Sequence, residues 1–138
     1  MDSIWTIHVD GAARGNPGPA GIGAIIRKQD GTVLKEVAEP LGQTTNNVAE
    51  YSALIRGLEE ARGLGGSRIH VYTDSELMAR QINGIYRVKT EHIIPLYRKA
   101  MQLLQVFDSY KVEHVRREFN KDADRLSNMG ADKVIGIG

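Results

Sequence analysis

The sequence contains no cysteine. Disulfide bonds, thiolate metal sites and a cysteine nucleophile are therefore excluded. The absence fits a reducing compartment, and we expect a cytoplasmic protein. No apolar run approaches the ~20 residues that a membrane-spanning helix needs, and the N-terminus does not have the pattern of a signal peptide. We therefore expect no contact with a membrane.

The chain also lacks an excess of either charge, with 18 basic and 17 acidic residues and a formal net charge of +1. Near-neutrality argues against a simple polycationic protein that binds nucleic acid through its overall charge. A nucleic-acid enzyme stays open, because acidic residues clustered at a metal site would mask a basic surface elsewhere. Basic residues are dense near the C-terminus, where a solvated helix face is the simplest explanation of Arg116, Arg117, Lys121 and Arg125.

Repeats, low-complexity segments and linkers are absent as well. The length corresponds to one domain, which we expect to span residues 1–138 and to act as a monomer. The 41% hydrophobic and 25% charged content is ordinary for a globular protein. A chain of this length can bury roughly two-thirds of its unfolded surface, so it can form a core without crosslinks.

Hydrophobic periodicity and turn signals predict the order βββαβααβα. Asp30-Gly31 marks a hairpin between the second and third strands. The predicted strands cover about residues 4–10, 20–29, 32–41, 68–73 and 110–116, and the predicted helices about residues 47–63, 75–83, 94–107 and 121–132. Residues 134–138 form an apolar tail that either docks on the body or frays.

This order of elements predicts the fold class. Three strands joined by short links indicate an antiparallel meander. The later strands follow helical crossovers, which produce parallel pairs covered by helices. We therefore predict an α/β fold with a five-stranded mixed sheet, in which three antiparallel strands precede the parallel ones and helices flank the sheet.

Three acidic residues occupy positions where a carboxylate needs an explanation. Asp10 and Asp74 each end an apolar strand, and Glu50 lies on the apolar stripe of the long helix. A buried carboxylate is costly unless it is paired or binds a metal. Ligand sites of open α/β sheets lie beyond the C-terminal ends of the strands. If the two strands are parallel neighbours, one ion could contact all three carboxylates.

Each of these acids also has a simpler explanation. Asp10 and Asp74 could be turn-forming residues, and Glu50 could be an acid favoured by the helix dipole. The matching placement of the three favours a cation site, and so an enzyme that acts on phosphates. Asp124 in the last helix is less distinct, because Asp122 and Asp132 compete with it and it could also be an acid favoured at a helix N-terminus.

Four motifs resemble the type 1 ribonuclease H family, in the order of that family and with compatible spacing, over about residues 4–131. They are Val9-Asp10-Gly11-Ala12 with Gly15-Asn16-Pro17-Gly18, Thr45-Asn46-Asn47 followed by Glu50, Tyr72-Thr73-Asp74-Ser75, and Asn120 with Ala123-Asp124. The resemblance implies the ribonuclease H-like fold. It also implies an endoribonuclease that cuts the RNA strand of RNA–DNA hybrids with two divalent ions, Mg²⁺ or Mn²⁺, and leaves 5′-phosphate and 3′-hydroxyl ends.

The same resemblance implies a role for each acidic residue. Asp10 is similar to the carboxylate that bridges both ions. Glu50 and Asp74 are similar to ligands of the ion that activates the attacking water, and Asp124 to a ligand on the leaving-group side. Its position after Asn-x-x-Ala favours Asp124 over Asp122. Hard carboxylate oxygens suit Mg²⁺, and two ions ~3.5–4 Å apart stabilise both the attacking and the leaving oxygen.

The substrate that the resemblance implies would be recognised by shape and by 2′-hydroxyls, because proteins read such duplexes across a wide, shallow minor groove. Matched to the family, the residues along the substrate would be Gly11, Asn16, Thr45, Asn46, Asn47 and Glu76. Helix capping by Thr45 or Asn46 and turn formation by Asn16 are the local alternatives.

One departure from the family concerns a loop. Many relatives carry a mobile loop with a His between the last strand and the last helix, and this His is thought to aid product release or proton transfer. Here residues 115–120 form a shorter segment without His. Arg117 or Glu118 is the candidate to replace it near the second ion.

A second departure concerns the grip on the substrate. Some relatives have a long basic insertion between the middle helices, but residues 84–94 are too few for it and hold only Arg87 and Lys89 as basic residues. Glu76 stands where many relatives have Gln. We therefore expect the hybrid affinity to be weaker or to depend on other basic residues.

Two other functions stay open. The chain could be a nuclease of the same fold that acts on double-stranded RNA or on DNA, which cleavage of labelled duplexes would distinguish. It could also be a binding module that has lost metal and catalysis. The presence of all four carboxylates argues against that third function.

Overall fold

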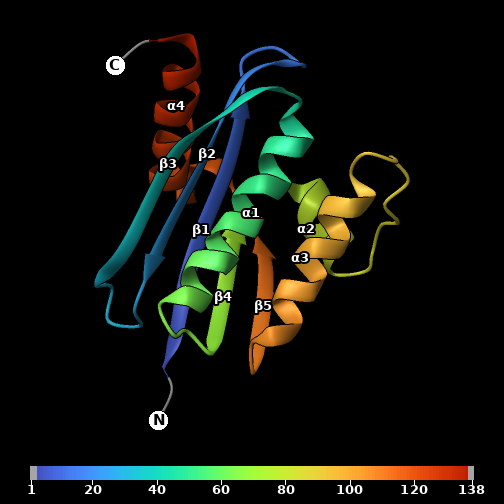
Figure 1. Cartoon of the computed structure of the whole chain (residues 1–138). Helices are drawn as coiled ribbons and strands as arrows, with labels where there is room; N and C mark the ends of the chain where they lie inside the picture. Colours follow the sequence, from blue (N-terminus) through green and yellow to red (C-terminus); the bar gives the residue numbers. More distant parts are fainter. Residues whose placement is uncertain (1–2, 137–138) are drawn as a thin grey trace.

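The computed structural model describes residues 3–136 as a five-stranded sheet with helices on both faces (Figure 1). The strands are β1 (Ile4–Ala13), β2 (Gly18–Arg27), β3 (Val33–Thr44), β4 (Arg68–Thr73) and β5 (Ser109–His114). The helices are α1 (Asn46–Gly63), α2 (Glu76–Ile82), α3 (Ile94–Val106) and α4 (Lys121–Ile135), and a short 3₁₀ turn, η1 (Arg117–Phe119), precedes α4.

The strand order is β3-β2-β1-β4-β5. β1 pairs antiparallel with β2, and β2 antiparallel with β3, whereas β1–β4 and β4–β5 are parallel pairs. At the β2–β3 hairpin the Thr32 backbone N–H donates to Asp30 Oδ1 at 2.9 Å, as expected of a turn aspartate. The predicted mixed sheet and the predicted order of elements are therefore confirmed.

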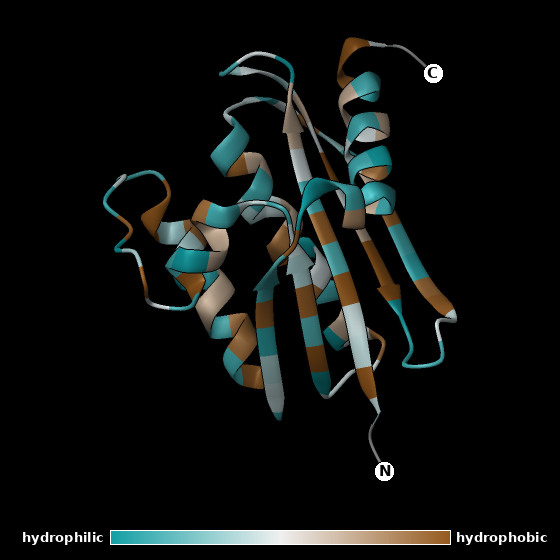
Figure 2. Cartoon of the chain, turned by 180° about the vertical axis from the view of Figure 1, so that it is seen from behind, coloured by the Kyte–Doolittle hydropathy of each residue, from teal (hydrophilic) through white to brown (hydrophobic). Residues whose placement is uncertain are grey.

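The helices form two unequal layers. α1, α2 and α3 cover one face of the sheet, and α4 lies on the other, against β2 and β3 (Figures 1 and 2). Strand alternation sends Ile7 and Val9 of β1 toward α1, where they meet the fully buried Leu54 and Leu58. Each such side chain contributes about 1.5–3 kcal/mol when it is buried fully. This core fixes α1 against β1, the two elements that supply Glu50 and Asp10.

Local signals account for where the site-bearing helices begin. Thr45 precedes α1, and its Oγ1 accepts a hydrogen bond from the Val48 N–H at 3.3 Å. Ser75 precedes α2, and its Oγ accepts from the Met78 N–H at 3.1 Å. Both are the side-chain caps that free N–H groups at a helix start require. The capping role predicted for Thr45 is thus observed.

β1 is longer than predicted. Its parallel pairing with β4 stops at Val9 and Thr73, but its antiparallel pairing with β2 continues as far as Ala13 and Ala20. Asp10 therefore does not end the strand, as the local pattern suggested. It lies where one neighbouring strand stops and the other continues, which opens the sheet on one side of its side chain.

The C-terminal segment also differs from the prediction. α4 continues to Ile135, so Val134 and Ile135 belong to the helix and not to a separate tail. Gly136 follows with a φ of 83°, a left-handed conformation that often ends helices. The rest of the predicted tail, residues 137–138, lies outside the described residues. None of the helices within residues 3–136 is long and apolar enough to cross a bilayer.

Candidate active site

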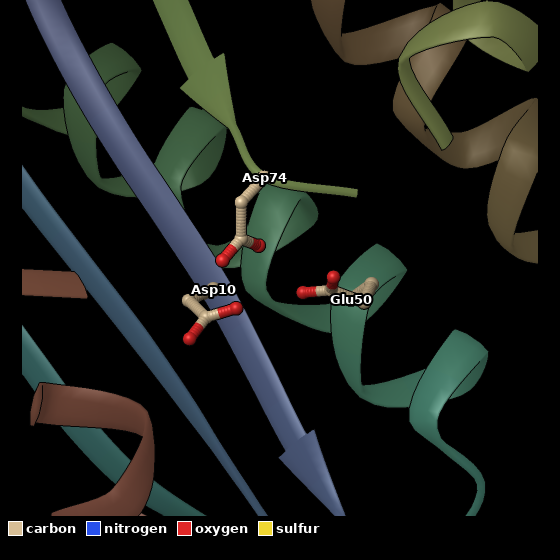
Figure 3. A group of neighbouring side chains, drawn as sticks. All are labelled: Asp10, Glu50 and Asp74. Carbon is tan, nitrogen blue, oxygen red and sulfur yellow. The ribbon is translucent and has the colours of Figure 1, made fainter. Parts of the chain in front are cut away.

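Three carboxylates converge at the edge of the sheet where β4 ends. One oxygen from each of Asp10, Glu50 and Asp74 lies within 4.8 Å of the other two. Figure 3 shows the side chains pointing toward one another from β1, from α1 and from the end of β4. Asp10 and Glu50 are only 4% and 6% exposed. Two of the three groups thus carry a desolvation cost that needs a compensating partner.

Backbone geometry brings these groups together. The last parallel partners, Val9 and Thr73, place Asp10 of β1 beside Asp74, the residue that directly follows β4. The Gly11 N–H donates to Glu50 Oε1 at 2.6 Å, which ties the first turn of α1 to β1. A Cβ at Gly11 would lie 2.2 Å from the Ala49 carbonyl carbon, so only glycine allows this close approach.

The cluster is electrostatically strained without a cation. Burial, followed by the charges of Glu50 and Asp74, raises the pKa of Asp10 far above its usual range. Burial also raises the pKa of Glu50, with Asp74 adding to the increase and the Gly11 N–H opposing it. Among residues 3–136, no ion pair neutralises any of the three carboxylates.

Asp124 lies beside the trio in the first turn of α4. It lines the same open hollow, of about 530 Å³, and it is close enough to Asp10 to raise the pKa of that carboxyl further. Its own Oδ1 is 3.6 Å from Arg117 Nη2. Asp122 instead contacts Arg27 Nη2 at 2.5 Å and does not line the hollow. The fold therefore separates these two aspartates, which local pattern alone could not.

The residues predicted along the substrate line two neighbouring hollows. Gly11, Asn46 and Glu76 line the hollow that holds the four carboxylates. A second hollow, of about 350 Å³, is lined by Asn16, Thr45, Asn46, Asn47, Thr90 and His92. Asn46 belongs to both, so the two hollows adjoin. The structure brings all six predicted residues to this surface, and their substrate-binding roles stay predictions.

Two asparagines hold this surface in shape. Asn16 Oδ1 accepts from the Asn46 N–H at 3.1 Å, and Asn46 Oδ1 accepts from the Ala13 N–H at 3.2 Å. The turn after β1 is thereby joined to the start of α1. Thr45 therefore caps α1 and Asn46 does not, since the Asn46 side chain bonds to β1 and not to an N–H of the helix.

Sequence reasoning missed several residues of the site. Thr90 and His92 face the second hollow from the loop before α3, and neither is among the residues expected along the substrate. Ser127 is fully buried, and its Oγ lies 3.1 Å from Asp10 Oδ2. Its position one turn after Asp124 on the buried face of α4 was the available signal.

The short segment before α4 places its two candidate residues differently. Arg117 lines the hollow of the carboxylates, whereas Glu118 lines a separate hollow with Arg27 and Asp122. Glu118 also contacts Arg116 Nη2 at 2.8 Å. Arg117 is thus the residue of this segment that reaches the acidic cluster.

The donor set fits a hard divalent cation. All the candidate ligand atoms are carboxylate oxygens, which Mg²⁺ and Mn²⁺ prefer. Asp10 and Glu50 remain unneutralised within the described ion pairs, so a cation would offset the repulsion that raises their pKa values. The hollow, of about 530 Å³, is open to solvent, so a cation bound there would be accessible to water and to a substrate phosphate.

The family model and the curated relatives that match this chain point to the same family. Residues 8–130 match the family model described as reverse transcriptase-like. The chain is 44% identical over 127 residues to a bifunctional protein of Mycobacterium tuberculosis, with 91% of this chain and 35% of that protein covered. It is 38% identical over 125 residues to ribonuclease HI of Halobacterium salinarum, with 91% and 63% covered. The chain therefore spans only about a third of the length of the first of these relatives.

Solved structures agree with this fold in detail. The N-terminal RNase H domain of the M. tuberculosis protein, determined as a fusion with maltose-binding protein, has a TM-score of 0.94 and 41% identity, with 98% of each chain covered. LC11-RNase H1 in complex with an RNA/DNA hybrid has a TM-score of 0.90 and 40% identity, with 95% of this chain and 99% of that chain covered. With the family model matching most of its length, the chain belongs to the ribonuclease HI family.

Proposed function

We propose that this protein is a metal-dependent endoribonuclease that hydrolyses the RNA strand of RNA–DNA hybrids. The observation that carries the proposal is the convergence of Asp10, Glu50 and Asp74 in an open hollow that Asp124 also lines. The hybrid as substrate is supported by a relative of 40% identity, LC11-RNase H1, whose crystal structure contains an RNA/DNA hybrid. We also propose that the chain forms a single domain and acts as a monomer in the cytoplasm. Size-exclusion chromatography with light scattering would test the oligomeric state.

The metal would be Mg²⁺ or Mn²⁺, with two ions in each site. Asp10 would hold both ions, Glu50 and Asp74 the one on the side of the attacking water, and Asp124 the one on the leaving side. When bound, such ions stabilise the negative charge on both reacting oxygens of a phosphodiester and favour the deprotonated water. The products would carry 5′-phosphate and 3′-hydroxyl ends.

The chain itself supplies rigidity at this site. The Gly11 N–H fixes Glu50 Oε1 at 2.6 Å, and the β1–β4 pairing fixes the spacing of Asp10 and Asp74. A preorganised ligand set does not have to rearrange when it binds, which lowers the cost of reaching the transition state. Two arginines line the same hollow and would face a phosphate backbone there: Arg14, which is paired with Asp132, and Arg117, which lies beside Asp124.

Substrate recognition would use uncharged groups. The second hollow is lined by amide and hydroxyl side chains, among them Asn16, Thr45 and Asn47, which can both donate and accept hydrogen bonds. Such groups suit sugar hydroxyls and phosphate oxygens and do not require a base sequence. We therefore propose recognition of the hybrid by shape.

The test is cleavage of labelled RNA–DNA hybrid, duplex RNA and duplex DNA of one sequence in Mg²⁺. We expect cutting of the hybrid, in its RNA strand, and much slower cutting of the other two. Comparable cutting of duplex RNA or DNA would instead favour a nuclease of different specificity. Binding of the hybrid without any cleavage would favour a binding module.

Replacing Arg117 by Ala is expected to lower single-turnover cleavage of the hybrid by about 10–100-fold, because it removes a charged donor next to Asp124. A hydrogen bond from the Arg117 guanidinium to a substrate phosphate would contribute about 1.5–3 kcal/mol, which corresponds to that range. Arg116→Ala in the same segment is the matched control, since Arg116 contacts Glu118 and does not line the hollow. Equal loss in both variants would contradict a specific role for Arg117.

A further inference from the structure

Ser127 joins the Asp10 carboxylate to α4 through a fully buried hydroxyl. Its Oγ lies 3.1 Å from Asp10 Oδ2 and 2.8 Å from the backbone carbonyl oxygen of Asp124. A serine hydroxyl carries one proton and can donate to only one of these acceptors at a time. Which acceptor receives the proton decides whether Ser127 acts on the metal site or only within its own helix.

The surroundings of Asp124 leave the hydroxyl available. The Asp124 carbonyl oxygen also accepts from Asn128 Nδ2 at 2.9 Å, so it does not depend on Ser127. An ionised carboxylate is the stronger acceptor, because hydrogen bonds to a charged group are roughly twice as strong as neutral ones. With Asp10 ionised, as metal binding requires, the Ser127 proton therefore goes to Asp10.

Two glycines of β2 make this contact possible. Gly23 is the antiparallel partner of Asp10, and a Cβ on it would lie 2.5 Å from the Ser127 backbone nitrogen. A Cβ on Gly21 would lie 2.3 Å from the Ser127 carbonyl oxygen. Side chains at these positions would push α4 away from the sheet, whereas glycines let Ser127 reach across β2 to the neighbouring strand.

The orientation of Asp10 follows from this arrangement. In Figure 3 one Asp10 oxygen points toward Glu50 and Asp74 and the other points away from them. We propose that Ser127 is a positioning residue for the metal site, whose hydroxyl holds Asp10 Oδ2 from α4 and thereby presents the remaining oxygen to a cation shared with Glu50 and Asp74. This inference rests on the proposed metal-dependent function.

Replacing Ser127 by Ala tests the inference, because it removes the hydroxyl. The variant is expected to fold, because Ala is smaller than Ser and favours a helix. Removing a group that orients a metal ligand lowers metal affinity or activity by roughly 10–100-fold. We expect Mn²⁺ to bind the nucleic-acid-free Ser127→Ala variant at least roughly 10-fold more weakly in calorimetry. The Mg²⁺ concentration for half-maximal cleavage should rise by a similar factor.

Ser52→Ala is the matched control, since Ser52 is a half-buried serine of α1 that does not line the hollow. It should bind Mn²⁺ as the parent protein does. If the parent binds Mn²⁺ and Ser127→Ala binds it equally well, with only a lower unfolding temperature, Ser127 is structural and the inference is overturned while the proposed function stands. If the parent itself neither binds Mn²⁺ nor cleaves, both are overturned.

Discussion

Replacing Asp74 by Asn is expected to lower the kcat for hybrid cleavage by about 10³-fold or more and to leave the protein folded. Asn keeps the shape of the side chain but removes one of the three charges that lie within 4.8 Å of one another. Metal ions supply several kcal/mol of charge stabilisation in phosphodiester hydrolysis, and about 4 kcal/mol corresponds to 10³-fold in rate.

The measurement is steady-state cleavage of a labelled hybrid at saturating Mg²⁺, with far-UV circular dichroism to verify folding. Asp122→Asn is the matched control, because Asp122 is an α4 aspartate outside the hollow that contacts Arg27. It should retain near-full activity. Full activity in Asp74→Asn would refute the assignment of this carboxylate to the metal site.

The metal-free protein is expected to lose stability as the pH rises from about 4 through neutrality. The lower end of this range, about pH 4, is the pKa of these carboxylates in the unfolded state. Burial and neighbouring acids raise the pKa of Asp10 and of Glu50 in the folded state. A raised pKa means that the folded state binds protons more tightly than the unfolded state. The contribution of Asp10 and Glu50 to the free energy of unfolding is therefore fully present below about pH 4. It is lost as the pH rises through their folded-state pKa values.

Asp10→Asn should remove much of this loss, because it replaces a buried charge by a neutral group of the same shape. We expect it to stabilise the metal-free protein by about 2 kcal/mol or more at pH 8, since each pKa unit corresponds to about 1.4 kcal/mol. Urea unfolding in EDTA at pH 5 and pH 8 measures the effect. Adding Mg²⁺ should raise the stability of the parent protein and have little effect on Asp10→Asn.

A surface acid provides the control for this prediction. The Asp122 side chain is 52% exposed and ion-paired with Arg27, so Asp122→Asn should not produce a stabilisation that grows with pH. If Asp10→Asn stabilises the protein at pH 8 no more than Asp122→Asn does, our inference that the buried carboxylates repel one another in the folded protein is wrong.

Local signals were sufficient for much of the fold. Thr45 and the glycines near residue 65 bracket α1, and the Asp30-Gly31 turn sets the β2–β3 hairpin. The stripe that carries Glu50 predicted which face of α1 is buried. These features depend on neighbours within one or two turns of chain, which the sequence displays directly.

Long-range pairing could not be read in the same way. The extension of β1 beyond Asp10 depends on β2, and nothing in the residues after Asp10 resembles a strand core. The contact of Ser127 with Asp10 joins residues that are 117 positions apart. Likewise, Thr90 and His92 reach the second hollow only because the loop before α3 folds toward the start of α1.

The family motifs and the structure identified different residues of the site. The motif Asn120 with Ala123-Asp124 singled out Asp124, and the structure then placed Asp122 away from the hollow, in contact with Arg27. Neither the motif nor the spacing distinguished Arg117 from Glu118, because both lie in one short segment. Only the path of η1 shows which of them reaches the carboxylates.

We infer that the carboxylate cluster holds the metal with which the chain cuts RNA in a hybrid. The most direct measurement follows a hybrid labelled on both strands, first in Mg²⁺, then after excess EDTA, then after Mg²⁺ is restored. We predict cutting of the RNA strand alone, complete arrest in EDTA and full recovery with Mg²⁺. Cutting that continues undiminished in EDTA, or that falls on the DNA strand, would contradict the account.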